Sequence, residues 1–153
     1  MSAIEARLAE QGILLPQAVA PVANYVPFVM TGNLLFLAGQ LPLKEGRLIA
    51  VGKLGADVGL DEGTQAARQC AINLLAQVKA ALGDLDRVQR VVRLGVFVAS
   101  LPDFADHPKV ANGASDLMAL AFGEAGRHVR TTVGCPSLPL NAAVEADAII
   151  EFT

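Results

Sequence analysis

Two charged residues stand in apolar, β-like segments near the end of the chain. Arg130 lies in residues 129–133 and Glu145 lies in residues 144–152, with a proline-containing turn between them. A buried arginine must pair with an acid, bind an anion or reach solvent, because an unpaired buried charge is too costly. Its planar guanidinium can hold a carboxylate through two parallel hydrogen bonds. Arg130 therefore binds an anionic ligand, pairs with a strand acid, or reaches the rim of the sheet.

Glu145 is the second candidate for chemistry. It shares a strand face with Asp147, because side chains two positions apart in a strand point to the same side. The rest of this segment is rich in Val, Ala and Ile. An unpaired glutamate there should have a raised pKa, which suits general acid–base catalysis. The alternative is a structural ion pair between Arg130 and Glu145 across the hairpin that the two segments would form.

Three further polar residues could line a site. Tyr25 is the only tyrosine and stands where an irregular segment enters a predicted strand, so it could border a pocket or serve as a core or interface aromatic. Asn112 lies in a predicted helical region, a position that is also typical of a solvated or capping residue. His107 precedes a proline, and this favours a turn residue over a catalytic base.

Other kinds of site have no matching motif. The chain has no P-loop, dinucleotide-binding glycine motif, nucleophile elbow or metal-ligand cluster, so we predict neither a cofactor nor a metal. Gly32, Gly39 and Gly46 are interpreted as turn glycines. Cys70 and Cys135 lack CxxC spacing and are predicted to be free, buried thiols in a reducing compartment.

The composition limits the class of protein. At 153 residues the chain should form one domain, residues 1–153, with residues 1–19 as a helical extension. Its 53% apolar content and mean hydropathy of +0.45, without a run long enough to span a bilayer, predict an oligomer and not a membrane protein. A net charge of -3 without a basic cluster argues against a nucleic-acid partner. No secretion signal is visible at the start, which predicts a cytoplasmic location.

The elements that would position these residues follow from periodicity and end signals. Ser2 and Glu5 have capping-box spacing at the start of a predicted helix, and the spacing of apolar residues changes from strand-like to helical near Thr64. We predict helices at 3–11, 64–82 (capped by Thr64) and 103–126, a loop at 52–60, and strands at 25–30, 35–38, 48–51, 91–100, 130–134 and 143–152. This order predicts an α+β fold with two helices on one face of a sheet.

Several of these segments together resemble the RidA/YjgF family, whose older name is the L-PSP endoribonuclease family. The matching segments, spread over roughly residues 20–152, are Tyr25 to Val29, Gly32 to Pro42, the helix Gln65 to Leu82, Val96 to Val98 with Asp103-Phe104, and Arg130 with Leu138-Pro139 and Val144 to Ala146. The spacing from Arg130 to Glu145 is the most specific part. The N-terminal helix and the long 106–115 region resemble the larger branch of the family.

The resemblance implies a chorismate-mutase-like fold and a homotrimer with three sites between subunits. It also implies cofactor-free hydrolysis of reactive enamines and imines, such as 2-aminoacrylate, to 2-keto acids and ammonia. By position, Arg130 matches the arginine that holds the substrate carboxylate, and Glu145 matches the acid that orients or activates water. Tyr25 and Asn112 match pocket residues.

Two positions depart from the family pattern. Thr132, in the pocket floor, stands where many members have Cys, and Ala38 stands where Ser is common. These changes leave the arginine clamp in place.

We therefore expect an enamine/imine deaminase that acts on a small carboxylate substrate. A non-catalytic trimer that binds small carboxylates is the alternative, because it needs Arg130 but not Glu145. Ribonuclease activity is less favoured, since the chain is acidic. A chorismate mutase reaction would rest on fold analogy alone.

Overall fold

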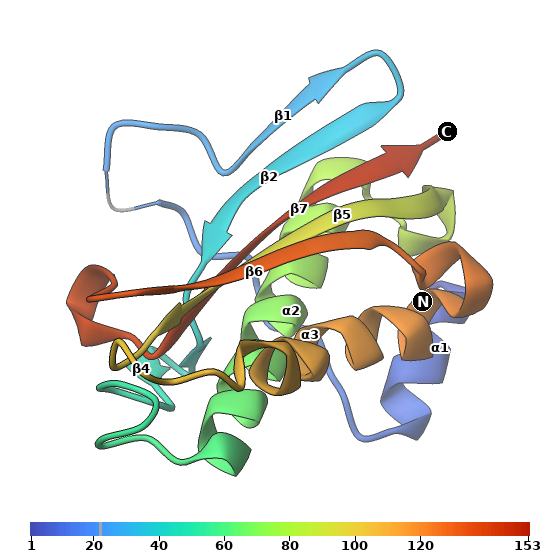
Figure 1. Cartoon of the computed structure of the whole chain (residues 1–153). Coiled ribbons are helices and arrows are strands. Elements are labelled where there is room, and N and C mark those ends of the chain that lie inside the picture. Colours follow the sequence, from blue (N-terminus) through green and yellow to red (C-terminus); the bar gives the residue numbers. More distant parts are fainter. Residues whose placement is uncertain (22) are drawn as a thin grey trace.

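A computed structural model describes residues 1–21 and 23–153 of the chain. Its centre is a five-stranded sheet with the strand order β1-β2-β7-β5-β6, in which only β5 and β6 run parallel (Figure 1). The strands are β1 (Phe28–Thr31), β2 (Leu34–Gln40), β5 (Val88–Ala99), β6 (Val129–Cys135) and β7 (Val144–Phe152). A separate two-stranded ribbon pairs β3 (Leu43–Lys44) with β4 (Arg47–Leu48).

Two long helices cover one face of this sheet (Figure 1). The helices are α1 (Ala3–Glu10), α2 (Leu60–Leu82) and α3 (His107–Phe122), with short 3-10 turns at Leu85–Arg87, Gly123–Gly126 and Pro139–Asn141. Helices α2 and α3 pack against each other and on the sheet, while α1 packs beside α3. The predicted α+β fold, with two helices on one sheet face, is therefore confirmed.

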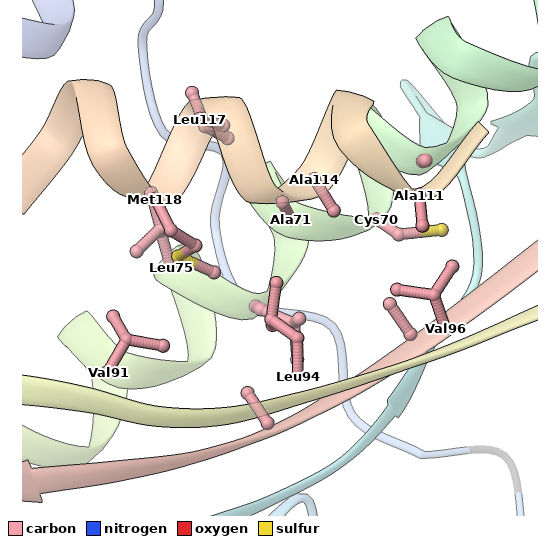
Figure 2. Packing of buried hydrophobic residues seen from close by; sticks show 14 of the residues in the cluster. Cys70, Ala71, Leu75, Val91, Leu94, Val96, Ala111, Ala114, Leu117 and Met118 are labelled. Carbon is pink, nitrogen blue, oxygen red and sulfur yellow. The ribbon is translucent and has the colours of Figure 1, made fainter. Parts of the chain in front are cut away.

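The core forms because each strand alternates between a helix-facing and an open side. In β7, residues Val144 and Ile150 are fully buried toward the helices, while Glu145 and Asp147 between them point to the open face. Figure 2 shows the labelled β5 residues Val91, Leu94 and Val96 pointing toward side chains of α2 and α3. Each fully buried Leu or Val contributes about 1.5–3 kcal/mol by leaving water.

Helix α1 is held by polar contacts at its first turn. The predicted capping box is confirmed, because the Ser2 hydroxyl accepts from the Glu5 amide and the Glu5 carboxylate accepts from the Ser2 amide. The Asp86 carboxylate also accepts hydrogen bonds from two free α1 amides, those of Ala3 (2.9 Å) and Ile4 (3.0 Å). These backbone bonds lower the pKa of Asp86.

The predicted C-terminal hairpin is wrong. Strands β6 and β7 both pair with β5 and not with each other. Strand β6 is parallel to β5 because α3 forms the crossover between them, and parallel neighbours need such a connection. The chain then crosses the end of β5 through the turn Pro139–Asn141, where Leu140 (φ 58°) and Asn141 (φ 60°) adopt left-handed backbone conformations.

Several predicted element boundaries also change. Helix α2 begins at Leu60, so Thr64 is inside the helix, and its hydroxyl donates to the Leu60 carbonyl at 2.8 Å instead of capping. The predicted strand 25–30 is shifted toward its end, and the predicted strand 48–51 is replaced by the β3–β4 ribbon.

The glycine predictions have mixed outcomes. Gly32 (φ 56°) and Gly46 (φ 79°) are turn glycines, as predicted. Gly39 is not a turn glycine, because it lies in β2 where the pairing with β7 is irregular. Within the described residues, no helix is both long and apolar enough to cross a membrane.

Candidate functional site

Arg130 lies on the helix-facing side of β6, opposite buried Leu94 in the register of the sheet. Its Nη1 donates to Asn112 Oδ1 at 2.9 Å and to Ser115 Oγ at 3.0 Å, and its Nη2 approaches the Pro108 carbonyl at 3.5 Å. All three acceptors are uncharged, and no carboxylate in the described part of the chain forms an ion pair with Arg130. The guanidinium is therefore held in place with its positive charge uncompensated.

Ser115 contacts Arg130 but was not predicted as a site residue from the sequence. Its hydroxyl accepts from Arg130 and lies 2.9 Å from His128 Nε2, while His128 Nδ1 lies 2.7 Å from the Gly126 carbonyl. Because a carbonyl can only accept, Nδ1 carries a proton, and in the neutral imidazole the Ser115 hydroxyl donates to Nε2. The spacing of Pro108, Asn112 and Ser115, four and then three residues, could have indicated this contact, since it places them on one helix face.

Thr132 shares the helix-facing side of β6 with Arg130, because side chains two positions apart in a strand point to the same side. Its hydroxyl oxygen is buried and forms no hydrogen bond within the described residues. Tyr25 lies elsewhere, just before β1 at the opposite edge of the sheet, and is 53% exposed. The chain thus brings Asn112 and Thr132 into the neighbourhood of Arg130, but not Tyr25.

Glu145 lies on the open face of β7, where its partner on the neighbouring strand β5 is Phe97. Its carboxylate occupies the space that a side chain at Gly39 would need, so the glycine in β2 permits this close approach. Burial, and secondarily repulsion from Asp147, raises the pKa of Glu145, in the direction that we predicted for an unpaired glutamate.

Asp147 has a different environment on the same face. It forms an ion pair with Arg93, with 3.2 Å between Nη1 and Oδ1, and it packs over Gly95 of β5. Gly39 and Gly95 therefore have equivalent roles, each leaving room for one β7 carboxylate. Neither role can be predicted from the sequence alone, because each depends on which strands are neighbours.

Arg130 and Glu145 lie on opposite faces of the sheet and on strands separated by β5. The alternative of a structural ion pair between them is therefore wrong. One chain carries two separate groups: an arginine clamp with Asn112 and Ser115, and an open-face carboxylate supported by Gly39.

Within the described part of the chain, no cysteine or histidine forms a direct hydrogen bond to Arg130 or Glu145. His128 is linked to Arg130 only through Ser115. Both cysteines are free; Cys70 is buried as predicted, but Cys135 is only half-buried. Burial raises the pKa of both thiols. Among the residues that the structure describes, no three His, Cys, Asp or Glu side chains gather as a metal site would require.

Comparisons with known proteins identify relatives along nearly the whole chain. Protein TCP17 from Trypanosoma cruzi is 51% identical over 97% of this chain and 94% of its own. The crystal structure of protein Atu1372 from Agrobacterium tumefaciens is 52% identical, with a TM-score of 0.93 over 98% of this chain and 92% of its own. A 2-iminobutanoate/2-iminopropanoate deaminase from Dermatophagoides farinae is 29% identical over 90% of this chain and 93% of its own.

A family model supports the same assignment. The model described as YjgF/chorismate mutase-like, putative endoribonuclease, matches residues 5–151, so the match includes Arg130 and Glu145. This agrees with the family resemblance seen in the sequence. The chain belongs to the YjgF/chorismate mutase-like family.

Proposed function

We propose that this protein is a cofactor-free hydrolytic deaminase that converts reactive 2-imino acids and their enamine tautomers to 2-keto acids and ammonia. The observation that carries the proposal is the uncompensated guanidinium of Arg130, fixed by Asn112 and Ser115. The deaminase from Dermatophagoides farinae, which is 29% identical, supports this reaction class.

Arg130 supplies the binding part of the reaction. With Nη1 engaged by α3, the remaining N–H groups of the guanidinium can donate to a substrate carboxylate. Fixing the carboxylate also fixes the neighbouring imine carbon, so that water meets it at a defined angle and distance. The Asn112 side chain keeps an amide group available beside the bound carboxylate.

Glu145 supplies the proton transfers. A water oxygen adds to the C=N carbon of the protonated imine while the Glu145 carboxylate accepts a proton from that water, and a carbinolamine forms. Glu145 returns this proton to the carbinolamine nitrogen, the C–N bond breaks as the C=O bond forms, and the departing ammonia takes up the hydroxyl proton, so that the 2-keto acid and an ammonium ion remain. A carboxyl group with a raised pKa suits both the acceptance and the return of this proton.

A complete site needs two copies of the chain, because Arg130 and Glu145 face opposite sides of one sheet. The β6 edge carries Arg130, and the β1 side carries Tyr25 and, two strands further in, Glu145. A closed ring in which the β6 edge of one copy meets the open face of the next would join these groups. We therefore propose a homotrimer with its sites between subunits, completed by Tyr25.

The test compares Arg130→Ala with Arg127→Ala, a neighbouring arginine whose side chain is 76% exposed. An amino-acid oxidase generates imino acids in the presence of each protein. The remaining imine is trapped as a semicarbazone, and the amount of semicarbazone measures how fast the imine decays. We expect Arg130→Ala to lower kcat/KM by about 100-fold or more, because the substrate loses its fixed position, and Arg127→Ala to keep it.

Two outcomes would reject the deaminase. One is wild-type protein that does not accelerate imine decay. The other is an Arg130→Ala variant that retains full activity. A third outcome would instead identify a non-catalytic binder. In that case calorimetry would show 2-keto acid binding that needs Arg130 and is unchanged in Glu145→Gln, and no turnover would be seen.

A further inference from the structure

A cavity lies at the end of the sheet where β5 and β6 finish, and Arg130 is not among the residues that line it. It has a volume of about 520 Å³. Its polar lining includes Lys53, Ser100 and His107 beside the Cys135 thiol, and its apolar lining includes Leu101, Phe104 and Pro136. The volume falls in the range of small-molecule sites, roughly 300–1,000 Å³.

Gly134 in β6 leaves the floor of this cavity without a side chain. A Cβ at this position would lie 2.5 Å from His107 Nε2 and 2.6 Å from Ser100 Oγ. Two polar groups from different segments therefore converge over one backbone position. Any larger residue at this position would displace both of them, so the glycine maintains the arrangement.

Ser100 is the strongest indication of a ligand. Its residue is only 8% exposed, it lines the cavity, and its hydroxyl forms no hydrogen bond with another described residue. This hydroxyl is open to the cavity, so it can donate a hydrogen bond to a ligand there. The His107 ring packs edge-on against Phe104, with 5.1 Å between ring centroids, and this contact fixes the direction of its nitrogens.

The charge of the lining selects the ligand class. Lys53 is the only charged side chain lining the cavity, and within the described part of the chain it forms no ion pair. The amino-terminal end of α3, which begins at His107, also borders the cavity and favours a negative group. One cation beside an apolar wall fits a singly charged acid with an apolar body.

We propose that this cavity is a binding site for a small organic monocarboxylate, separate from the Arg130 clamp. The carboxylate accepts hydrogen bonds from Lys53, Ser100 and His107, and an aromatic or branched body packs against Leu101 and Phe104. The proposal does not depend on deaminase activity, because neither Arg130 nor Glu145 lines the cavity.

The test measures benzoate binding to the full chain by calorimetry, in an Arg130→Ala background so that the clamp cannot contribute. Benzamide, which has the same shape without charge, serves as the ligand control. We expect saturable benzoate binding that persists without Arg130, and a Kd that rises about tenfold or more in Lys53→Met and in Ser100→Ala. Gly134→Ala should abolish binding, while Gly59→Ala, where an added Cβ meets nothing within 4 Å, should not change it.

Ser100→Ala keeps the test valid if Gly134→Ala does not fold, because the deleted hydroxyl has no protein partner. Benzoate binding that disappears in Arg130→Ala and is unaffected by Lys53→Met would overturn the proposal. That result would not count against the proposed role of Arg130 as a carboxylate clamp. Equal binding of benzamide would also overturn it. A change of native mass in Lys53→Met or Ser100→Ala would show that the cavity belongs to a subunit contact instead.

Discussion

At the scale of single residues, the open face presents two carboxylates in contrasting states. Among the residues that the structure describes, Glu145 has no cationic partner, and burial raises its pKa, whereas Asp147 pairs with Arg93. An acid with a raised pKa loses its proton at higher pH in the folded chain than in the unfolded chain. The proposed base should therefore become active as pH rises through a value above 4.5, the ordinary value for this group.

Asp147→Asn should move this acid limb of kcat/KM to lower pH. The substitution removes the repulsion from Asp147 and frees the Arg93 charge, and both effects favour the Glu145 carboxylate. Burial, the larger cause, remains, so the limb should stay above pH 4.5. The measurement is a pH–rate profile, with Glu151→Gln on the same strand face as the control. An acid limb that does not move, or moves upward, would contradict this assignment.

Thr132→Val should stabilise the fold by about 1 kcal/mol or more. The Thr132 hydroxyl is buried without a partner among the described residues, and valine has nearly the same shape without the polar atom. Thr131→Val, on the exposed side of the same strand, is the matched control for strand propensity. The measurement is the free energy of unfolding in denaturant. A loss of stability in Thr132→Val alone would show that the hydroxyl has a partner in solution.

At the scale of elements, local patterns were sufficient for the helices but not for the strand neighbours. The capping box of Ser2 and Glu5 and the apolar stripe of α2 depend only on nearby residues, so they could be read from the sequence. The order β7-β5-β6 depends on the crossover through α3, and the expected hairpin was wrong for that reason. The same limit applies to the site. Arg130 and Glu145 could be recognised from the sequence as charges in apolar strands. The space that Gly39 leaves for the Glu145 carboxylate could not, because it depends on how β2 and β7 pair.

The crossing of α2 and α3 depends on Gly113. A Cβ there would collide with the Thr64 carbonyl oxygen and would lie 3.2 Å from the Arg68 amide nitrogen, so the two backbones touch at this point. Gly113→Ala should cost about 1–3 kcal/mol of stability despite the better helix propensity of alanine, because backbone cannot move aside as a flexible side chain can.

Chemical denaturation measures this cost, with Gly59→Ala as the control at an open position. Because α3 also carries Asn112 and Ser115, a displaced helix should misplace Arg130. The surviving folded protein should then lose the proposed deaminase activity as well. Full stability in Gly113→Ala would mean that the two helix backbones do not touch at this point.

At the scale of the whole molecule, the open face of the sheet is a continuous surface. The sheet register aligns one row across all five strands, formed by Val29, Phe36, Ile149, Arg93 and Val129. Phe36 is 41% exposed and Val129 is 67% exposed, which is costly for large apolar side chains left in water. An interface with other copies would bury this row and, in the proposed ring, bring Glu145 to the Arg130 edge of a neighbour.

Mixing two inactive chains tests this sharing directly. Arg130→Ala and Glu145→Gln chains are each expected to be inactive alone. Co-refolded at equal amounts, they should regain about a quarter of the wild-type activity, because a site needs an intact Arg130 from one chain and an intact Glu145 from its neighbour, and each condition is met half the time. Mixing Arg130→Ala with the double variant should restore nothing. If Arg130 and Glu145 acted within one chain, no mixture could recover activity, since every chain would still lack one of the two groups.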